Sequence, residues 1–376
     1  MAHEAPAARP ESFQMHDSFD LRALRDIGLS HDTVQAALAR PRPDGTRLAR
    51  VVEIQRDHLI VHDGADAHAV QPTPALRAAL EHEHDSLVVG DWVWWRLAAS
   101  DGDRGWAVER LPARNRVSRR DPAGGRQGLV ANVDTALIVM GLDNDFNLRR
   151  LDRFLVLAHS ADARVVVVLT KADGCADPAG AVARVRTHLG DARDDVAVLA
   201  VDGRAREAAT ALAPWLVRGA TLVTLGSSGA GKTTLTNTLT GATAITGSVR
   251  ESDERGQHTT TVRTLHRTAG GACLIDTPGL RQLWLDADAD TLNDAFPEIG
   301  MLALRCRYRN CRHAQEPGCA VREQVPRERL VSFQKLLREA NRESDDIYQR
   351  RRQLAVMKQR TRDSRARSAA RDAGKW

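Results

Sequence analysis

The stretch GSSGAGKTT at residues 226–234 decides the fold of this chain. It fits the pattern G-x-x-x-x-G-K-[ST], in which a glycine-rich backbone turns its N–H groups onto phosphate oxygens. The apolar run TLVTLG leads into it and the helix-like LTNTLTG follows, which makes a chance glycine-serine turn a poor explanation. We therefore predict a P-loop formed by Gly226, Ser227, Ser228, Gly229, Ala230, Gly231, Lys232, Thr233 and Thr234.

Apolar runs rich in β-branched residues lie on both sides of this loop along the chain. They are DTALIVM (134–140), ARVVVVLT (163–170), DVAVLAV (195–201), ATLVTLG (220–226) and ACLID (272–276). Runs that are apolar throughout are typical of parallel strands buried on both faces. The region 129–288 is therefore predicted to be an α/β domain with a doubly wound sheet.

A second motif, Thr170-Lys171-Ala172-Asp173, follows the run ARVVVVL. Doubly wound sheets bind ligands at the carboxyl ends of their strands, so this tetrapeptide should lie beside the P-loop. It resembles the [N/T]KxD motif that reads guanine, since a carboxylate at Asp173 can accept hydrogen bonds that guanine donates and adenine does not. Alone it would also fit a solvated turn. Next to a P-loop we assign it to the base of GTP or GDP.

The motif DTPG (276–279) ends the run ACLI and resembles a GTPase switch element. Asp276 should hold Mg²⁺ through water, and the Gly279 N–H should bind the γ-phosphate. Within the P-loop, Lys232 should reach the β and γ phosphates, and Thr233 should ligate the magnesium ion. These four residues are predicted to carry the phosphate chemistry.

The motif HTTT (258–261) resembles the other switch element. Thr260, or a neighbouring threonine, should close over Mg²⁺ and the γ-phosphate. Leu280 follows DTPG where signalling GTPases carry a glutamine that orients the attacking water, so intrinsic hydrolysis should be slow. His258 is our candidate for orienting that water, and a solvent-exposed histidine without this role is the alternative.

The order of these motifs along the chain is unusual. Ordinary GTPases run from the P-loop through the two switches to the base motif, whereas here the base motif comes first. The termini of compact domains often lie close together, so new chain ends can open at a surface loop without disturbing the sheet. The domain is therefore predicted to be circularly permuted, with the segment after DTPG leading directly into the C-terminal part.

Three of the five cysteines fall in one short stretch with a histidine. The pattern C-x4-C-x-H-x5-C supplies a complete tetrahedral set for one structural Zn²⁺, and reduced cysteines on an irregular loop are the alternative. The predicted ligands are Cys306, Cys311, His313 and Cys319. We expect this zinc-binding domain, 289–350, to have a core separate from the nucleotide motifs. Four arginines next to or between the ligands should face phosphates: Arg305, Arg307, Arg309 and Arg312.

The region 46–113 has a different pattern, made of short strand-like runs separated by turn residues. The runs are LARVVEIQ, HLIVHD, AHAVQ, DWVWWRLA and GWAVERL. Five such strands fit a small RNA-binding barrel, the OB-fold. Trp92 and Trp94 should share one face of their strand and Trp95 the other. We expect most of these tryptophans to be core, with base stacking as the alternative.

The remaining segments carry weaker signals. Residues 1–45 fit a mobile arm followed by a small helical cap, and 114–128 fit a basic, glycine-rich linker. A polar helical stretch should cover 327–360. The basic tail, 351–376, either tracks RNA phosphates, which we favour, or is a solvated segment.

The composition is that of a soluble globular protein, with 42% hydrophobic and 27% charged residues. No apolar run approaches the ~20 residues that span a bilayer, and the N-terminus lacks the apolar centre of a secretory signal. We therefore expect a cytoplasmic protein with no membrane contact. The net charge of +5 is modest, but the bunched Lys and Arg residues fit a polyanionic partner.

Taken in order, TKAD, GSSGAGKTTL, GQHTTT, DTPGL and CRYRNCRHAQEPGCAV make the chain resemble the RsgA (YjeQ) family over roughly residues 46–350. The resemblance implies an OB-fold, a permuted GTPase domain and a zinc-binding helical domain, with GTP or GDP, Mg²⁺ and one structural Zn²⁺ as ligands. It also implies GTP hydrolysis stimulated by the small ribosomal subunit late in its maturation, and contact with rRNA. We expect the protein to be a monomer.

Two departures from the GTPase pattern affect the base site. Thr170 stands where many GTPases have Asn, so amide contacts should be lost, and VDGR (201–204) replaces the usual Ser-Ala step. Two other functions remain open at this point. One is a GTP-dependent RNA-binding switch whose turnover is incidental. The other is a P-loop ATPase or kinase, against which the TKAD motif argues.

Overall fold

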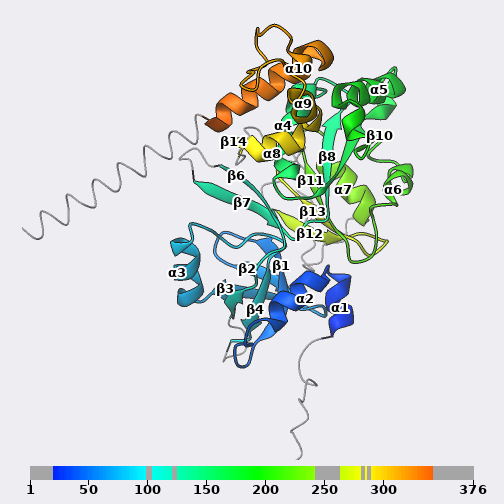
Figure 1. The fold of residues 1–376 in the computed structure, drawn as a ribbon. Helices are drawn as coiled ribbons and strands as arrows, with labels where there is room; N and C mark the ends of the chain where they lie inside the picture. The colour runs from blue at the N-terminus through cyan, green and yellow to red at the C-terminus, as the bar shows by residue number, and fades with distance from the viewer. Residues whose placement is uncertain are drawn as a thin grey trace, which may run out of the picture.

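The computed structural model describes residues 20–98, 104–120, 125–241, 263–280, 284–285 and 289–341. A β-barrel with two short helices lies at one end, a sheet with helices on both faces lies in the middle, and a helical C-terminal part lies at the other end (Figure 1). His258, Thr260 and the tail 351–376 lie outside the described residues, so their predictions stay open.

The central sheet is doubly wound, as predicted. Its strands are β8 (Thr135–Gly141), β9 (Arg164–Thr170), β10 (Ala197–Ala200), β11 (Thr221–Leu225), β12 (Thr264–Arg267) and β13 (Cys273–Asp276). They lie in the order β10-β9-β8-β11-β13-β12, and all neighbours are parallel except β12 and β13. Every predicted apolar run forms a strand. The unpredicted β12 has the sequence TLHR, which carries no apolar run.

Helices cover both faces of this sheet. They are α4 (Leu148–His159) and α5 (Pro178–Leu189) on one face, and α6 (Glu207–Leu212) and α7 (Lys232–Thr240) on the other. Ile138 and Met140 of β8 pack on the α4 side, while Leu137 and Val139 pack on the α7 side. Because each side chain of β8 is buried, its sequence is apolar without alternation.

The N-terminal strands form a closed five-stranded barrel. They are β1 (Arg47–Ile54), β2 (Leu59–His62), β3 (Ala67–Pro72), β4 (Trp92–Arg96) and β5 (Gly105–Arg110). The pairing runs β1-β2-β3-β5-β4 and back to β1, with only β3 and β5 parallel, which confirms the predicted OB-like barrel. The unpredicted α3 (Pro74–His82) connects β3 to β4, and the Thr73 hydroxyl caps it.

The three tryptophans of β4 are all buried, with no more than 2% of any side chain exposed. Trp95 packs inside the barrel. Trp92 and Trp94 point outward against the predicted helical cap, which forms α1 (Leu21–Asp26) and α2 (His31–Leu38). The predicted alternation is therefore confirmed, and these rings serve as core, since buried rings offer no face to a base.

The described parts of 114–128, which are 114–120 and 125–128, form strands and not the predicted linker. They carry β6 (Arg116–Arg120) and the start of β7 (Arg126–Ala131), which pair with each other, and β14 (Trp284–Leu285) pairs with β6 (Figure 1). The prediction was wrong because the charges of this segment are satisfied by folding. Arg116 pairs with Asp85 at 2.9 Å and with the buried Asp91 at 2.5 Å, so a basic sequence forms ordered strands.

The C-terminal part consists of α8 (Ala289–Ala295), α9 (Pro297–Ala303), α10 (Ala320–Gln324) and a helix over 327–341. That last helix confirms the first part of the predicted stretch. Phe296 and Phe333 belong to the same buried cluster as Leu169 of β9, so the expected separate core was wrong. Among the described helices, none combines the length and the apolar character needed to cross a bilayer.

Buried charged residues also join the C-terminal helices to the central domain. The Asp152 carboxylate on α4 accepts a hydrogen bond from Arg329 of the 327–341 helix and lies 3.0 Å from Nε2 of His188 on α5. Arg329 Nε donates to Glu298 of α9 at 2.8 Å. Burial alone would raise the pKa of Asp152, but the hydrogen bond from His188 and the charge of Arg329 hold it below its usual value. Removing one partner would leave a buried charge unpaired, so the network fixes how the helices dock.

Arg50 of β1 is fully buried where the barrel, the N-terminal helices and the central sheet meet. Its Nη1 donates to the Ile27 carbonyl at 2.6 Å and to the Thr221 hydroxyl at 2.9 Å, and its Nη2 donates to the Asn132 carbonyl at 3.2 Å. The guanidinium also lies over Trp92. Burial lowers the pKa of Arg50, so these acceptors are needed to hold its charge.

Replacing Arg50 with alanine should lower the free energy of unfolding by about 2–4 kcal/mol, because buried carbonyl oxygens of Ile27 and Asn132 lose their donor. Thermal unfolding followed by circular dichroism would measure the change. Arg47→Ala, on the same strand but exposed, is the matched control and should have little effect. Equal losses in the two variants would contradict the role given to Arg50.

Candidate active site and metal centre

The base motif and the P-loop meet at one edge of the central sheet. Strands β9 and β11 run parallel on either side of β8, so their carboxyl ends open onto the same edge. The buried Thr170 hydroxyl donates to the Ala230 carbonyl at 2.6 Å. Lys171 Nζ donates to the Gly229 carbonyl at 2.7 Å. Two motifs far apart in the chain are thus joined by direct hydrogen bonds.

The P-loop has the local geometry that its sequence predicts. Gly231 has φ +88°, and a Cβ there would lie 3.0 Å from the Thr170 hydroxyl, so glycine meets both constraints. Helix α7 begins at Lys232, whose buried Nζ donates to the carbonyls of Gly226 at 3.1 Å and Ser227 at 2.6 Å. Burial lowers the pKa of Lys232. The loop therefore offers backbone N–H groups, a helix N-terminus and a cation to phosphates.

The two predicted magnesium-binding residues lie together. Thr233 Oγ1 donates to Asp276 Oδ2 at 3.0 Å, and the other carboxylate oxygen accepts from the Thr224 hydroxyl at 3.1 Å. Asp276 is buried at the end of β13, beside the P-loop strand. A hydroxyl and a carboxylate are ligands that Mg²⁺ prefers, so this pair is suited to hold it.

The DTPG loop lies directly on the P-loop. A Cβ added to Gly279 would come within 2.4 Å of Ser228 Cα, so a larger residue does not fit there. The Leu280 N–H donates to the Gly226 carbonyl at 3.1 Å. The Gly279 N–H is thereby positioned at the same edge as the phosphate-binding backbone.

A hollow of about 340 Å³ opens beside the base motif. Its wall combines Lys171 and Asp173 with Thr234 of α7 and with residues 202–204, which follow β10. Ala172 starts a single 3₁₀ turn that presents Asp173 to the hollow. A second hollow of about 490 Å³ lies over Ser227, Ser228 and Gly229. The two hollows share Lys171, and we call them the base end and the phosphate end after the motifs that line them.

Two acidic residues of this site were not predicted. Asp143 Oδ2 accepts from Lys171 Nζ at 2.6 Å, and this contact lowers the pKa of Asp143. Asp145 accepts from the Gly141 N–H at 3.1 Å and from the Ser227 hydroxyl. The signal was present in the sequence, because GLDND follows the apolar run DTALIVM at the end of a central parallel strand.

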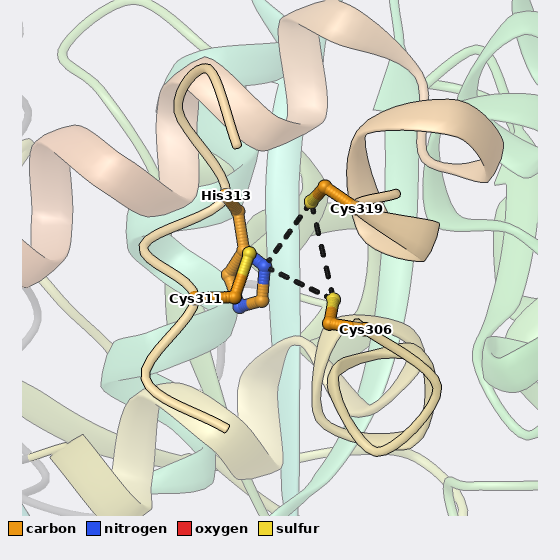
Figure 2. A group of neighbouring side chains, drawn as sticks. All are labelled: Cys306, Cys311, His313 and Cys319. Atoms are coloured by element: carbon orange, nitrogen blue, oxygen red, sulfur yellow. Dashed lines mark hydrogen bonds between the residues drawn. The ribbon is translucent and has the colours of Figure 1, made fainter. Parts of the chain in front are cut away.

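The four predicted metal ligands come together between α9 and α10 (Figure 2). Their ligand atoms all lie within 4.8 Å of one another. Cys306 Sγ lies 3.9 Å from Cys319 Sγ and 3.6 Å from His313 Nδ1, and Cys319 Sγ lies 3.5 Å from that nitrogen. Metal–sulfur bonds of ~2.3 Å in a tetrahedron give edges of ~3.8 Å, so these separations fit an ion at the centre.

The loop around this cluster is shaped by Glu316. Its carboxylate accepts N–H groups of Arg312 and Ala314 at 2.9 Å and of Gln315 at 3.1 Å, which lowers the pKa of Glu316 to about 2. Burial lowers the pKa of His313, which favours the neutral imidazole that coordinates metals. The Cys₃His arrangement can therefore hold a metal ion in a preformed loop.

Comparison with known proteins identifies the family. Residues 110–286 match the sequence profile of the RsgA GTPase family. A "Small ribosomal subunit biogenesis GTPase RsgA" from Xylella fastidiosa (strain M23) is 48% identical over 284 residues, which cover 74% of this chain and 82% of that relative. This chain belongs to the RsgA GTPase family. An RsgA from Xanthomonas campestris pv. campestris (strain B100) is 42% identical over 298 residues, covering 77% of this chain and 79% of the relative.

Solved structures agree with the fold. YjeQ from Thermotoga maritima superposes with a TM-score of 0.57 at 22% identity, covering 78% of this chain and 98% of that chain. YloQ, titled a circularly permuted GTPase, gives 0.55 at 21% identity, covering 79% of this chain and 96% of that chain. The predicted resemblance is confirmed: this chain is a circularly permuted RsgA-family GTPase, a hydrolase that acts on GTP.

Thr170→Val should weaken GDP binding about 5- to 10-fold, because the buried Ala230 carbonyl loses its donor and one of the two hydrogen bonds that tie the base motif to the P-loop is lost. Isothermal titration calorimetry with GDP would measure the loss. Thr170→Ser keeps a hydroxyl and should bind GDP nearly as well as the unmodified chain. Similar weakening in both variants would show that side-chain packing, not the hydrogen bond, is what matters.

Proposed function

We propose that this GTPase acts in late maturation of the small ribosomal subunit, where it binds the subunit and its rRNA in the cytoplasm and hydrolyses GTP. The names of its relatives from Xylella and Xanthomonas support the biological part of this proposal. The observation that carries the GTP-dependent part is the Thr170–Ala230 contact, since it brings the base motif and the P-loop to one edge of a sheet.

The residues at this edge supply what GTP hydrolysis needs. Asp173 would accept hydrogen bonds from guanine, Lys232 would bind the β and γ phosphates, and the Gly279 N–H would bind the γ-phosphate. Thr233 and Asp276 would hold Mg²⁺, which when bound neutralises charge on the phosphates. His258 and Thr260 remain the proposed water-orienting and magnesium-closing residues.

The connection after the DTPG loop couples this chemistry to the rest of the chain. Leu280 hydrogen-bonds the P-loop, and the chain then reaches β14, α8 and the metal-binding loop rather than the base motif. A contact between the γ-phosphate and Gly279 would therefore change the position of the C-terminal part. This supports a GTPase whose nucleotide state is communicated to a partner bound there.

The metal-binding loop offers a basic surface for that partner. Its side chains Arg305, Arg307, Arg309 and Arg312 are all exposed. We propose that one structural Zn²⁺ fixes the loop and that these guanidinium groups bind rRNA phosphates.

Purified small ribosomal subunits should raise the rate of GTP hydrolysis by a factor on the order of 10², because positioning one catalytic side chain typically gains that much. Release of inorganic phosphate at saturating GTP, with and without subunits, would measure the stimulation. Large subunits are the matched control and should have no comparable effect.

The variant Lys232→Ala tests whether the observed hydrolysis belongs to this site, since its activity should be lost under both conditions. Hydrolysis that small subunits do not accelerate would contradict the proposed ribosomal role. It would leave the family assignment untouched.

Metal analysis of the purified protein should give about one zinc per chain. Cys311→Ser should lose the metal and lower the thermal unfolding midpoint, because three ligands no longer close the tetrahedron. GDP affinity should stay nearly unchanged, because α7 and the P-loop pack on the opposite face of the sheet from the metal loop. Cys175→Ser, outside the cluster, is the control. A folded protein free of metal would exclude the structural zinc.

A further inference from the structure

Arg204 lies on the carboxylate that guanine would use. Its Nη2 is 2.6 Å from Asp173 Oδ2, and both residues line the hollow at the base end of the site. Arg204 belongs to the VDGR step that replaces the usual Ser-Ala step, and the sequence alone assigns it no role. The structure gives it a direct contact with the predicted base-binding residue.

The loop holds Arg204 in this position. Asp202 Oδ1 accepts the Arg204 backbone N–H at 3.0 Å and lies 3.3 Å from its Nε. These contacts lower the pKa of Asp202, with the backbone hydrogen bond as the largest cause. Arg204 therefore bridges two carboxylates, one on its own loop and one on the base motif.

Guanine and the arginine side chain present their hydrogen-bond donors to a carboxylate in the same way. The N1–H and exocyclic amine of guanine flank one carbon and form a guanidine-like edge, and a carboxylate accepts two parallel hydrogen bonds from such an edge. The arginine side chain presents N–H groups in that same planar arrangement. The guanine edge would use both oxygens of Asp173, and Oδ2 already accepts from Arg204, so the base and Arg204 compete for that oxygen.

We propose that Arg204 is an internal substitute for the guanine base: it pairs with Asp173 when no base is bound and must swing away before GTP or GDP can dock. This inference rests on the proposed guanine site. It makes Arg204 a determinant of nucleotide affinity, since only the fraction of molecules with Asp173 released can accept the base.

The solvent exposure of the Arg204–Asp173 pair determines how strongly it can change nucleotide affinity. The side chains of Arg204 and Asp173 are 68% and 42% exposed, so their ion pair is screened by water and salt. Pairs of this kind shift an equilibrium by a factor of about 1.5 to 5. Arg204 therefore tunes nucleotide binding and does not block it.

The test compares GDP binding by the full-length unmodified chain, Arg204→Ala and Arg206→Ala. Arg206 is exposed two residues away, so its replacement removes the same charge without touching Asp173. Arg204→Ala should bind GDP about 1.5- to 5-fold more tightly, with the gain in the association rate measured by stopped flow. Arg206→Ala should match the unmodified chain.

Two further measurements distinguish competition for Asp173 from a general effect of removing one positive charge. Inorganic pyrophosphate, which has no base, should bind equally to the unmodified chain and to Arg204→Ala. The GDP advantage of Arg204→Ala should shrink at ~1 M salt, because screening weakens the ion pair in the unmodified chain.

The outcomes distinguish this inference from the function on which it rests. If Arg206→Ala behaved normally and Arg204→Ala bound GDP no more tightly than the unmodified chain, the proposed competition between Arg204 and the base would be wrong. Weaker GDP binding by Arg204→Ala would indicate that Arg204 contacts the bound base. If the unmodified chain bound neither GDP nor GTP, the guanine site itself would be wrong.

Discussion

The hydrogen bond from the Thr170 hydroxyl to the Ala230 carbonyl is the contact on which the nucleotide site depends. It joins the end of β9 to the loop after β11, and Lys171 adds a second tie to Gly229. Thr170 stands where many GTPases have asparagine, and its hydroxyl reaches the P-loop backbone directly. Gly231 leaves room for this approach, because a Cβ there would lie 3.0 Å from the Thr170 hydroxyl. The permuted order matters little to this geometry, since parallel strands open onto one edge in whatever order they are connected.

Much of the fold could be predicted because the burial of its strands leaves a recognisable pattern of apolar residues in the sequence. Parallel strands such as β8 and β9 are apolar throughout, and the barrel strand β2 alternates between buried and half-buried residues. The P-loop, the base motif and the Cys₃His spacing were visible because phosphates and metals demand fixed residue types at fixed intervals.

The rest could not be predicted because it depends on partners that are distant in sequence. The basic strand β6 is ordered by Asp85 and Asp91 of the barrel, and the continuous C-terminal core is completed by α4 and by the buried pairing of Arg329 with Asp152. Arg204 looked like one more exposed arginine of a turn. Its significance appears only once Asp173 is seen 2.6 Å away.

Arg50 has a consequence for how the molecule meets large partners. By binding α1, the barrel and β11 together, it fixes the barrel to one end of the sheet, while the shared core fixes the metal-binding loop to the other (Figure 1). The barrel and the arginine-bearing loop are therefore held at a constant span. A large partner that contacts both the barrel and this loop would have to present its two contact surfaces at that same fixed separation.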